Sequence, residues 1–270
     1  MANSMKAKDL YNALEQEFRP WGCTEVFSSM GLQFDHTDVV NKVYTAAFVS
    51  DEVMDQMEAR GATDCLLFTH HPVPQKKDLT KDSPPPSPQL IARLKARRIS
   101  VFNYHIPLDR VSPWSPGTNL AKALGLTPYE DFYEQNLVRM GLLCRSPYQT
   151  LSQLARAAEQ AFGHSVKVYP YGGEDLREGR VAIMGGGASN PDIYAQLREK
   201  GINVFLTGMT SPNIPWAARN HEEAQKNAVS LVGGTHYSTE KYAVMEMVKF
   251  FENLGLECEF LPETPNFEEL

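Results

Sequence analysis

Short apolar runs alternate with helical patterns along this 270-residue chain, and this alternation restricts its fold more than any other feature. In the first half, strands are predicted at residues 42–49, 63–69 and 99–103, with helices near 51–61 and 89–98 between them. The run at 63–69 is almost continuously apolar, as expected for a strand that is covered on both faces. This β-α-β-α-β order predicts an α/β fold with a mostly parallel sheet and helices on both of its faces.

The second half of the chain repeats this alternation. Strands are expected at 180–184, 203–207 and 229–232, and helices at 151–162, 191–200, 216–227 and 240–254. Residues 61–69 resemble residues 201–207, and each of these segments is followed by a strand that ends in a histidine-bearing turn. We therefore expect two similar α/β lobes that face a cleft, lobe one at about 1–130 and lobe two at about 131–262, with a peripheral acidic segment after Pro262.

The composition argues against several classes of protein. The net charge of −7 and the pI of about 5.5 disfavour a general nucleic-acid-binding surface, although a local basic patch stays open. No apolar stretch approaches the ~20 residues of a membrane-spanning helix, and the first residues lack the apolar core of a secretory signal. Four widely spaced cysteines without a Cys-x-x-Cys pair disfavour a zinc ribbon or a disulfide framework. We therefore expect a cytoplasmic protein without a membrane partner.

Three histidine-bearing segments follow predicted strands, at residues 68–72, 103–109 and 234–240. They hold four of the seven histidines and two well-spaced carboxylates. The candidate metal ligands are His70, His71, His105, Asp109, His236 and Glu240. Neutral imidazole and carboxylate groups bind Zn, Mn, Fe(II), Ni or Co well, and ligands of open α/β sheets lie at the carboxyl ends of the strands. The pattern therefore predicts a metal site with more than one ion.

Other polar residues have simpler interpretations. His36, His164 and His221 are expected to be hydrogen-bonded loop residues. The glycine run at 185–187 lacks the Gly-Lys-Ser/Thr ending of a P-loop, so a tight strand-to-helix turn is favoured over a phosphate site. In the proline-rich loop at 72–88, a solvated loop is favoured over contact with an anionic substrate. The residues considered for such a contact are Lys76, Lys77 and Lys81.

At these residues the chain resembles the Nif3 family, also called the Nif3-like dinuclear-metal proteins. The matching segments are Thr69 to Pro72, His105 to Asp109, Gly117-Thr118-Asn119, Gly31-Leu32-Gln33, Thr207-Gly208 and 234–240. Three places depart from the family pattern. Ser28-Ser29-Met30 stands where the family usually has Asp-Asn before Gly-Leu-Gln, and Met209 stands where it often has Glu. His105 lies in Asn-Tyr-His-Ile-Pro rather than in the family's usual His-Thr-Asn-like context. The resemblance extends over nearly the whole chain, and these departures affect expected substrate contacts rather than expected metal ligands.

The resemblance implies a single Nif3-like domain over 1–270, built of two α/β lobes without an inserted middle domain. It implies two divalent metal ions per chain, held by His70, His71, Asp109, His236 and Glu240, with His105 as a ligand or a close neighbour. It also implies a toroidal homohexamer. Family members often carry the name GTP cyclohydrolase 1 type 2 homolog.

Two functions are open at this stage. The first is a metal-dependent hydrolase that acts on a nucleotide, a cyclic amide or a phosphoester, in which two ions share a carboxylate and a water. Glu240 is the favoured catalytic residue, because it could bridge the ions and accept a proton. The alternative is a non-catalytic metal-binding scaffold, or a protein that stores or delivers metal ions. Nucleic-acid binding through a toroid is disfavoured by the acidic balance.

Overall fold

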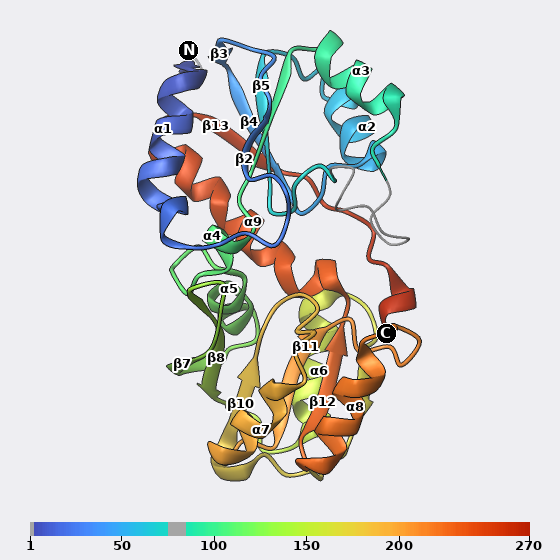
Figure 1. Cartoon of the computed structure of the whole chain (residues 1–270). Coiled ribbons are helices and arrows are strands. Elements are labelled where there is room, and N and C mark those ends of the chain that lie inside the picture. The colour runs from blue at the N-terminus through green and yellow to red at the C-terminus, as the bar shows by residue number, and fades with distance from the viewer. Residues whose placement is uncertain (1–2, 75–84) are drawn as a thin grey trace. The chain divides into compact units, whose positions relative to one another are not determined.

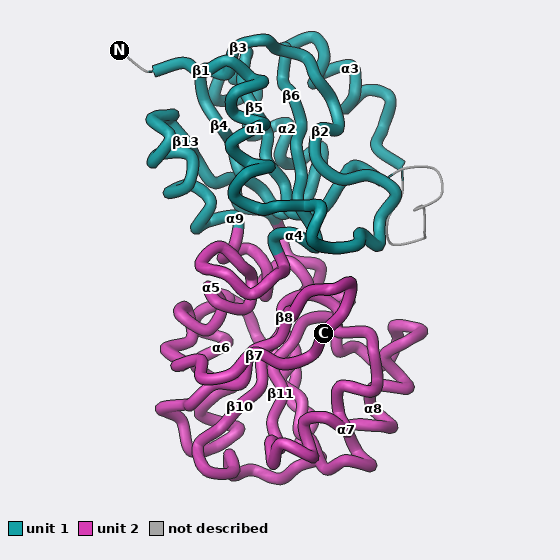
Figure 2. Tube along the Cα trace, turned by 60° about the vertical axis from the view of Figure 1, so that its left-hand side comes forward, with its two compact units in different colours: residues 1–108, 244–263 teal, residues 109–243, 264–270 magenta. Residues whose placement is uncertain are grey.

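A computed structural model describes residues 3–74 and 85–270. Lys76, Lys77 and Lys81, and with them most of the loop expected at 72–88, lie outside the described residues. The chain divides into two compact units (Figure 2): unit 1 contains residues 1–108 and 244–263, and unit 2 contains residues 109–243 and 264–270. These units are defined by their internal contacts, and the lobe boundaries expected from the sequence stay a prediction.

Unit 1 is built on a five-stranded sheet in the order β13-β4-β5-β6-β2 (Figure 1). Its strands are β2 (Gly31–Phe34), β4 (Lys42–Ala46), β5 (Cys65–Thr69), β6 (Ile99–Asn103) and β13 (Glu257–Phe260). The four strands from β13 to β6 are parallel, and β2 joins the edge antiparallel to β6. All five residues of β5 and of β6 are buried, which explains the continuous apolar runs in the sequence.

The helices of unit 1 are α1 (Ala7–Phe18), α2 (Asp51–Ala59), α3 (Pro88–Ala96) and the short α4 (Ile106–Asp109), whose last residue opens unit 2. Helix α1 begins without a side-chain cap, whereas serine residues cap α2 and α3. The hydroxyl groups of Ser50 and Ser87 accept hydrogen bonds from Val53 N–H and Leu90 N–H, and so start α2 and α3. A short 3-10 turn, η1 (Pro20–Gly22), follows α1, and β1 (Met5–Lys6) pairs with β3 (Val39–Val40).

One hydrophobic core of unit 1 lies between its sheet and the helices α2 and α3. Met54 and Met57 of α2 and Leu90 and Leu94 of α3 pack there against sheet residues such as Leu67. Each of these five side chains is at most 2% exposed, so each contributes roughly 1.5–3 kcal/mol of transfer free energy. This packing fixes the sheet edge from which two of the histidine segments leave.

Unit 2 is built on a six-stranded sheet in the order β7-β8-β10-β11-β12-β9. Its strands are β7 (Thr127–Gln135), β8 (Val138–Arg145), β9 (Lys167–Tyr169), β10 (Arg180–Ile183), β11 (Val204–Gly208) and β12 (Ser230–Gly234). The central strands β10, β11 and β12 are parallel, and the outer strands are antiparallel. The mostly parallel α/β architecture predicted from the sequence is therefore confirmed, with antiparallel strands added at the edges.

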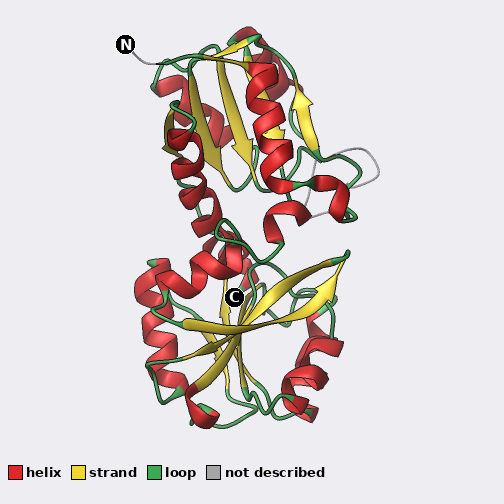
Figure 3. Cartoon of the chain, turned by 90° about the vertical axis from the view of Figure 1, so that its left-hand side faces the viewer, coloured by secondary structure: helices red, strands yellow, loops and turns green. Residues whose placement is uncertain are grey.

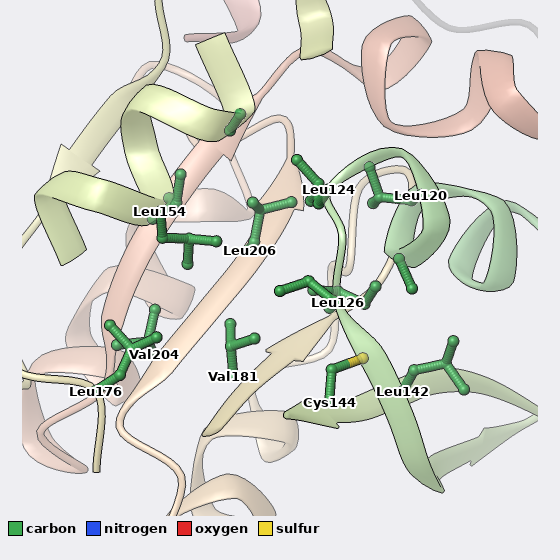
Figure 4. Packing of buried hydrophobic residues seen from close by; sticks show 14 of the residues in the cluster. Leu120, Leu124, Leu126, Leu142, Cys144, Leu154, Leu176, Val181, Val204 and Leu206 are labelled. Carbon is green, nitrogen blue, oxygen red and sulfur yellow. The ribbon is translucent and has the colours of Figure 1, made fainter. Parts of the chain in front are cut away.

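Helices cover both faces of the unit 2 sheet (Figure 3). They are α5 (Pro116–Ala123), α6 (Leu151–Phe162), α7 (Asp192–Glu199) and α8 (Ala217–Lys226), with the 3-10 turns η2 (Arg177–Gly179) and η3 (Phe267–Glu269). On one face, Leu120 and Leu154 from α5 and α6 pack against Leu206 (Figure 4). On the other face, Leu197 of α7 packs in a cluster with Phe205. The longest helix, α9 (His236–Asn253), begins in unit 2 and ends in unit 1.

The length and hydropathy of the helices bear on whether one of them could cross a membrane. Among the described residues, no helix combines the length and the apolar character that crossing a membrane requires.

Candidate metal centre

Three imidazole rings gather at the carboxyl edge of the unit 1 sheet. The strands β5 and β6 are parallel and in register, with Thr69 paired to Asn103, so the segments that follow them leave the sheet at the same edge. The rings of His70 and His71 have their centroids 4.6 Å apart, and each lies 5.1 Å from the ring of His105. The first two histidine segments of the sequence therefore meet in unit 1.

Hydrogen bonds orient two of these rings. Nδ1 of His70 lies 3.1 Å from the carbonyl oxygen of Tyr104, which can only accept, so this nitrogen carries the proton. In a neutral His70 ring the lone pair is then on Nε2. Nδ1 of His105 lies 2.9 Å from Oε1 of Glu25. Metal-binding histidines usually direct their second nitrogen to a carbonyl or a carboxylate in this way, so the donor set fits a metal ion.

Aromatic side chains flank the third ring. The ring of Phe48 stacks on His71 with 4.5 Å between centroids and 6° between planes, and Phe27 meets the same ring edge-on at 6.1 Å. The backbone N–H groups of Ala47 and Phe48 donate to the carboxylate of Glu263. Because Phe48 belongs to the loop after β4, the position of the His71 ring depends on the conformation of this loop.

The candidate ligand Asp109 ends helix α4. This helix starts directly after His105, whose carbonyl oxygen accepts a hydrogen bond from Leu108 N–H at 3.0 Å. Asp109 follows within the same turn and is 9% exposed. It is the first residue of unit 2.

In unit 2, His236 and Glu240 lie on one face of helix α9. Nε2 of His236 and Oε2 of Glu240 are 3.1 Å apart, as four-residue spacing on a helix allows. The helix was expected to start at residue 240, and this was wrong by four residues. Thr235 explains the earlier start, because its hydroxyl group accepts a hydrogen bond from Ser238 N–H at 3.1 Å and caps the first turn.

The glycine run at 185–187 packs against this pair of side chains. Gly186 has a φ of +70°, and a Cβ atom at this position would overlap Oε1 of Glu240 and lie 3.4 Å from Nε2 of His236. At Gly187 a Cβ atom would lie 3.3 Å from the ring of Trp216. The run is therefore a tight turn after β10, as the sequence predicted. The absence of side chains in this turn leaves room for the Glu240 carboxylate.

Glu25 contacts the imidazole cluster, and no pattern in the sequence pointed to this contact. Burial opposes ionisation of its carboxyl group, but hydrogen bonds from His105 and from the backbone of Ile106 and Phe27, together with the charge of His105, hold its pKa below the ordinary value. Eighty residues separate Glu25 from His105, and Glu25 lies in a segment without helical or strand periodicity. Periodicity in a single sequence could therefore not pair them.

The segment after Pro262 is not peripheral, which corrects the expectation from its acidic composition. Glu263 is partly buried against the loop after β4 in unit 1. In unit 2, Oε2 of Glu269 accepts a hydrogen bond from His236 N–H at 2.7 Å, and its carbonyl oxygen accepts one from Ser211 N–H. Burial raises the pKa of Glu269, although the His236 backbone opposes this. A carboxylate at the start of α9 also matches the positive end of the helix dipole.

The remaining histidines make hydrogen bonds, as expected, but His221 lies in helix α8 and not in a loop. Nδ1 of His36 lies 2.9 Å from the carbonyl oxygen of Ile99. His164 lies 2.5 Å from Ser238 Oγ through Nε2, and its Nδ1 faces the Ser165 carbonyl oxygen. The ring of His221 is held between the Tyr171 hydroxyl group and the Thr210 carbonyl oxygen.

Side chains with the chemistry to hold a metal ion thus occur in both units. They are His70, His71 and His105 in unit 1 and Asp109 and Glu240 in unit 2.

Solved structures with a similar fold span almost the whole chain. The structure described as protein ybgI of unknown function is 20% identical, with a TM-score of 0.80, over 97% of this chain and 100% of that chain. Reduced HcgD from Methanocaldococcus jannaschii is 21% identical, with a TM-score of 0.74, over the same shares. At these identities the likeness concerns the fold alone.

The sequences of curated relatives are similar to this chain over nearly its whole length. A protein of Clostridium acetobutylicum named GTP cyclohydrolase 1 type 2 homolog is 25% identical over 92% of this chain and 90% of its own length. A protein of Escherichia coli K12 with the same name is 24% identical over 97% of this chain and 99% of its own length. The sequence pattern of the Duf34/NIF3 (NGG1p interacting factor 3) family matches residues 5–266. The chain therefore belongs to the Duf34/NIF3 family.

Proposed function

We propose that this protein binds two divalent metal ions and acts as a metal-dependent hydrolase. The proposed ligands are His70, His71, His105, Asp109, His236 and Glu240. The observation that carries the proposal is the imidazole cluster of unit 1, in which two rings direct Nδ1 to an acceptor, as metal-binding histidines usually do with their second nitrogen. The pairing of His236 with a buried carboxylate in unit 2 supports it.

The donor set suits borderline metals rather than a single one. Imidazole nitrogen and carboxylate oxygen are accepted by Zn, Mn, Fe(II), Ni and Co. When bound, such ions lower the pKa of a water toward about 7 and polarise a carbonyl or phosphoryl oxygen. The proposed role of Glu240 is to accept a proton from the attacking water. Glu240 is only 3% exposed, so bulk water has little access to its carboxylate.

The proposed substrate is a nucleotide or a related cyclic amide or phosphoester. The names of the curated relatives make purine nucleotides the first compounds to test. Nothing about this class follows from the fold, because one α/β scaffold can host many reactions.

Metal content gives the first test. Protein purified without chelator, or reconstituted with Mn, Zn, Ni or Fe(II), is expected to hold close to two ions per chain by elemental analysis. The variants His70→Ala and Glu240→Gln should each lower this content, whereas His36→Ala should not. A content that stays near zero after reconstitution contradicts the proposal.

Turnover separates a hydrolase from a metal-storing scaffold. The protein loaded with each metal should be screened against nucleotides, cyclic amides and phosphoesters, with product release followed by chromatography. A hydrolase should turn over at least one class and lose most of its kcat on Glu240→Gln at saturating metal. A scaffold would retain its metal and show no turnover with any loaded form.

A further inference from the structure

Glu25 lies in the segment between η1 and β2, and several hydrogen-bond donors hold its side chain. Its side chain is 9% exposed. Oε1 accepts hydrogen bonds from Val26 N–H at 2.8 Å and Phe27 N–H at 3.3 Å, and Oε2 accepts one from Ile106 N–H at 3.1 Å. Three backbone donors therefore fix the carboxylate in one orientation before its contact with the imidazole ring is considered.

The fixed carboxylate determines which nitrogen of His105 carries the proton. Oε1 lies 2.9 Å from Nδ1 of that ring. An ionised carboxylate can only accept, so the hydrogen between the two atoms belongs to Nδ1. The lone pair of the neutral ring then lies on Nε2. His70 has the same arrangement through the Tyr104 carbonyl oxygen, so in both neutral rings the lone pair is on the same nitrogen.

The segment that carries Glu25 also packs against the ring itself. Phe27 meets His105 edge-on, with 4.8 Å between centroids and 66° between planes. Ile106, whose N–H binds the other oxygen of Glu25, is the residue directly after His105 and is 1% exposed. The carboxylate thus holds both the ring of His105 and the backbone next to it.

We propose that Glu25 is a positioning residue that fixes His105 as a metal ligand through Nε2. This inference rests on the proposed function and decides a question that the sequence left open, namely whether His105 is a ligand or a neighbour of the ligands. A carboxylate behind a ligating imidazole orients the ring and raises its basicity, and loss of such a partner typically lowers metal affinity 10–100-fold.

The tautomer of His105 can be measured directly in metal-free wild-type protein. In ¹⁵N NMR spectra of the histidine side chains at neutral pH, His105, assigned with a His105→Gln variant, should show the Nδ1–H tautomer. Addition of Zn²⁺ should shift its Nε2 resonance far more than its Nδ1 resonance. A ring protonated at Nε2 in the metal-free protein, or a Zn²⁺ shift confined to Nδ1, overturns the inference.

Variants of Glu25 test the effect on affinity. By calorimetry with Zn²⁺, Glu25→Ala should bind about 10–100-fold more weakly than wild type and show a mixture of His105 tautomers. Glu25→Gln keeps an acceptor oxygen, so it should retain the Nδ1–H tautomer and recover part of the affinity. The matched control is Glu174→Ala, which removes a carboxylate bound to the backbone N–H of Ser152 in unit 2 and should leave the affinity unchanged.

The outcomes separate this inference from the proposed function. If wild-type protein binds no divalent ion, the proposed function fails and the ligand role of His105 fails with it. If wild type binds two ions and Glu25→Ala binds them equally tightly, with an unchanged His105 spectrum, only the role of Glu25 fails. Should Glu25→Ala not fold, Glu25→Gln and the wild-type spectra still decide between these outcomes.

Discussion

At the scale of single residues, two features of position 186 favour glycine, namely its backbone conformation and the lack of room for a side chain. Its φ of +70° is in the left-handed region, which costs other residues roughly 1–2 kcal/mol. Its α-carbon also faces the carboxylate of Glu240, where a methyl group has no room. The first reason concerns the stability of the fold, and the second concerns the position of a proposed metal ligand.

A comparison of two glycine substitutions should separate these effects. Gly186→Ala should lower the free energy of unfolding by at least the roughly 1–2 kcal/mol of the backbone strain and also displace Glu240, so that metal content falls. Gly163→Ala is the control, because Gly163 has a φ of +80° and no atom within 4 Å of an added Cβ. It should lose comparable stability by urea denaturation and keep its metal. Equal metal content in both variants would count against a ligand role for Glu240.

The position of some candidate site residues in the fold could be predicted from the sequence, and that of others could not. His70 and His71 follow β5 directly and His236 lies two residues after β12, so the strand pattern alone predicted their place at a sheet edge. The contact between Glu25 and His105 depends on how an irregular segment folds back across the sheet edge. Such a contact leaves no periodic pattern, and Glu25 has the same residue type as many solvated carboxylates.

At the scale of elements, the partly buried carboxyl group of Glu263 attaches the segment after β13 to the loop after β4. Glu263 accepts hydrogen bonds from Ala47 N–H at 2.6 Å and Phe48 N–H at 3.1 Å. Burial raises its pKa from the ordinary 4.5 to about 8, with a small contribution from Glu52, although both backbone donors oppose the shift. The folded protein therefore binds a proton at this residue that the unfolded chain releases.

This attachment should make stability depend on pH in a defined window. Because the folded pKa is raised, the contribution of Glu263 is fully present below pH 4.5 and is lost as the pH rises through about 8. Between these values it should lower the free energy of unfolding by up to about 1.4 kcal/mol per pH unit. Urea denaturation of wild type and Glu263→Gln from pH 5.5 to 8.5 measures this slope. Parallel profiles for the two proteins would show that Glu263 is ionised in the folded state throughout.

The strands that are buried along their whole length were predicted well, and the hairpin of unit 2 was missed. The strands β5, β6, β11 and β12 are buried along their whole length and appeared as apolar runs. The hairpin of β7 and β8 was not predicted, because most of β7 is exposed and its residues do not alternate clearly. Its turn uses positive φ at Asn136 and Leu137, and leucine is unusual there.

At the scale of the whole molecule, each unit repeats one scheme. Each has three adjacent parallel strands, β4-β5-β6 in unit 1 and β10-β11-β12 in unit 2. The two sequence segments that resemble each other contain the middle strands β5 and β11. In each unit the next strand of the sheet, β6 or β12, is followed by a candidate ligand, His105 or His236. The weak internal similarity therefore corresponds to equivalent places in the two sheets.

Because candidate ligands occur in both units, metal binding should stabilise the whole protein. An ion that binds only the folded chain adds about 2.7 kcal/mol to its stability when the free ion is at 100 times its Kd. For a chain of this size, each kcal/mol corresponds to roughly 2–4 °C in Tm. Chelator-treated protein titrated with Mn²⁺ in thermal denaturation should therefore show a Tm that rises with metal concentration. His70→Ala and His236→Ala, one from each unit, should both lose most of this rise, while His36→Ala should keep it. A rise that survives His236→Ala but not His70→Ala would contradict a ligand role for His236 and leave that of the imidazole cluster of unit 1 in place.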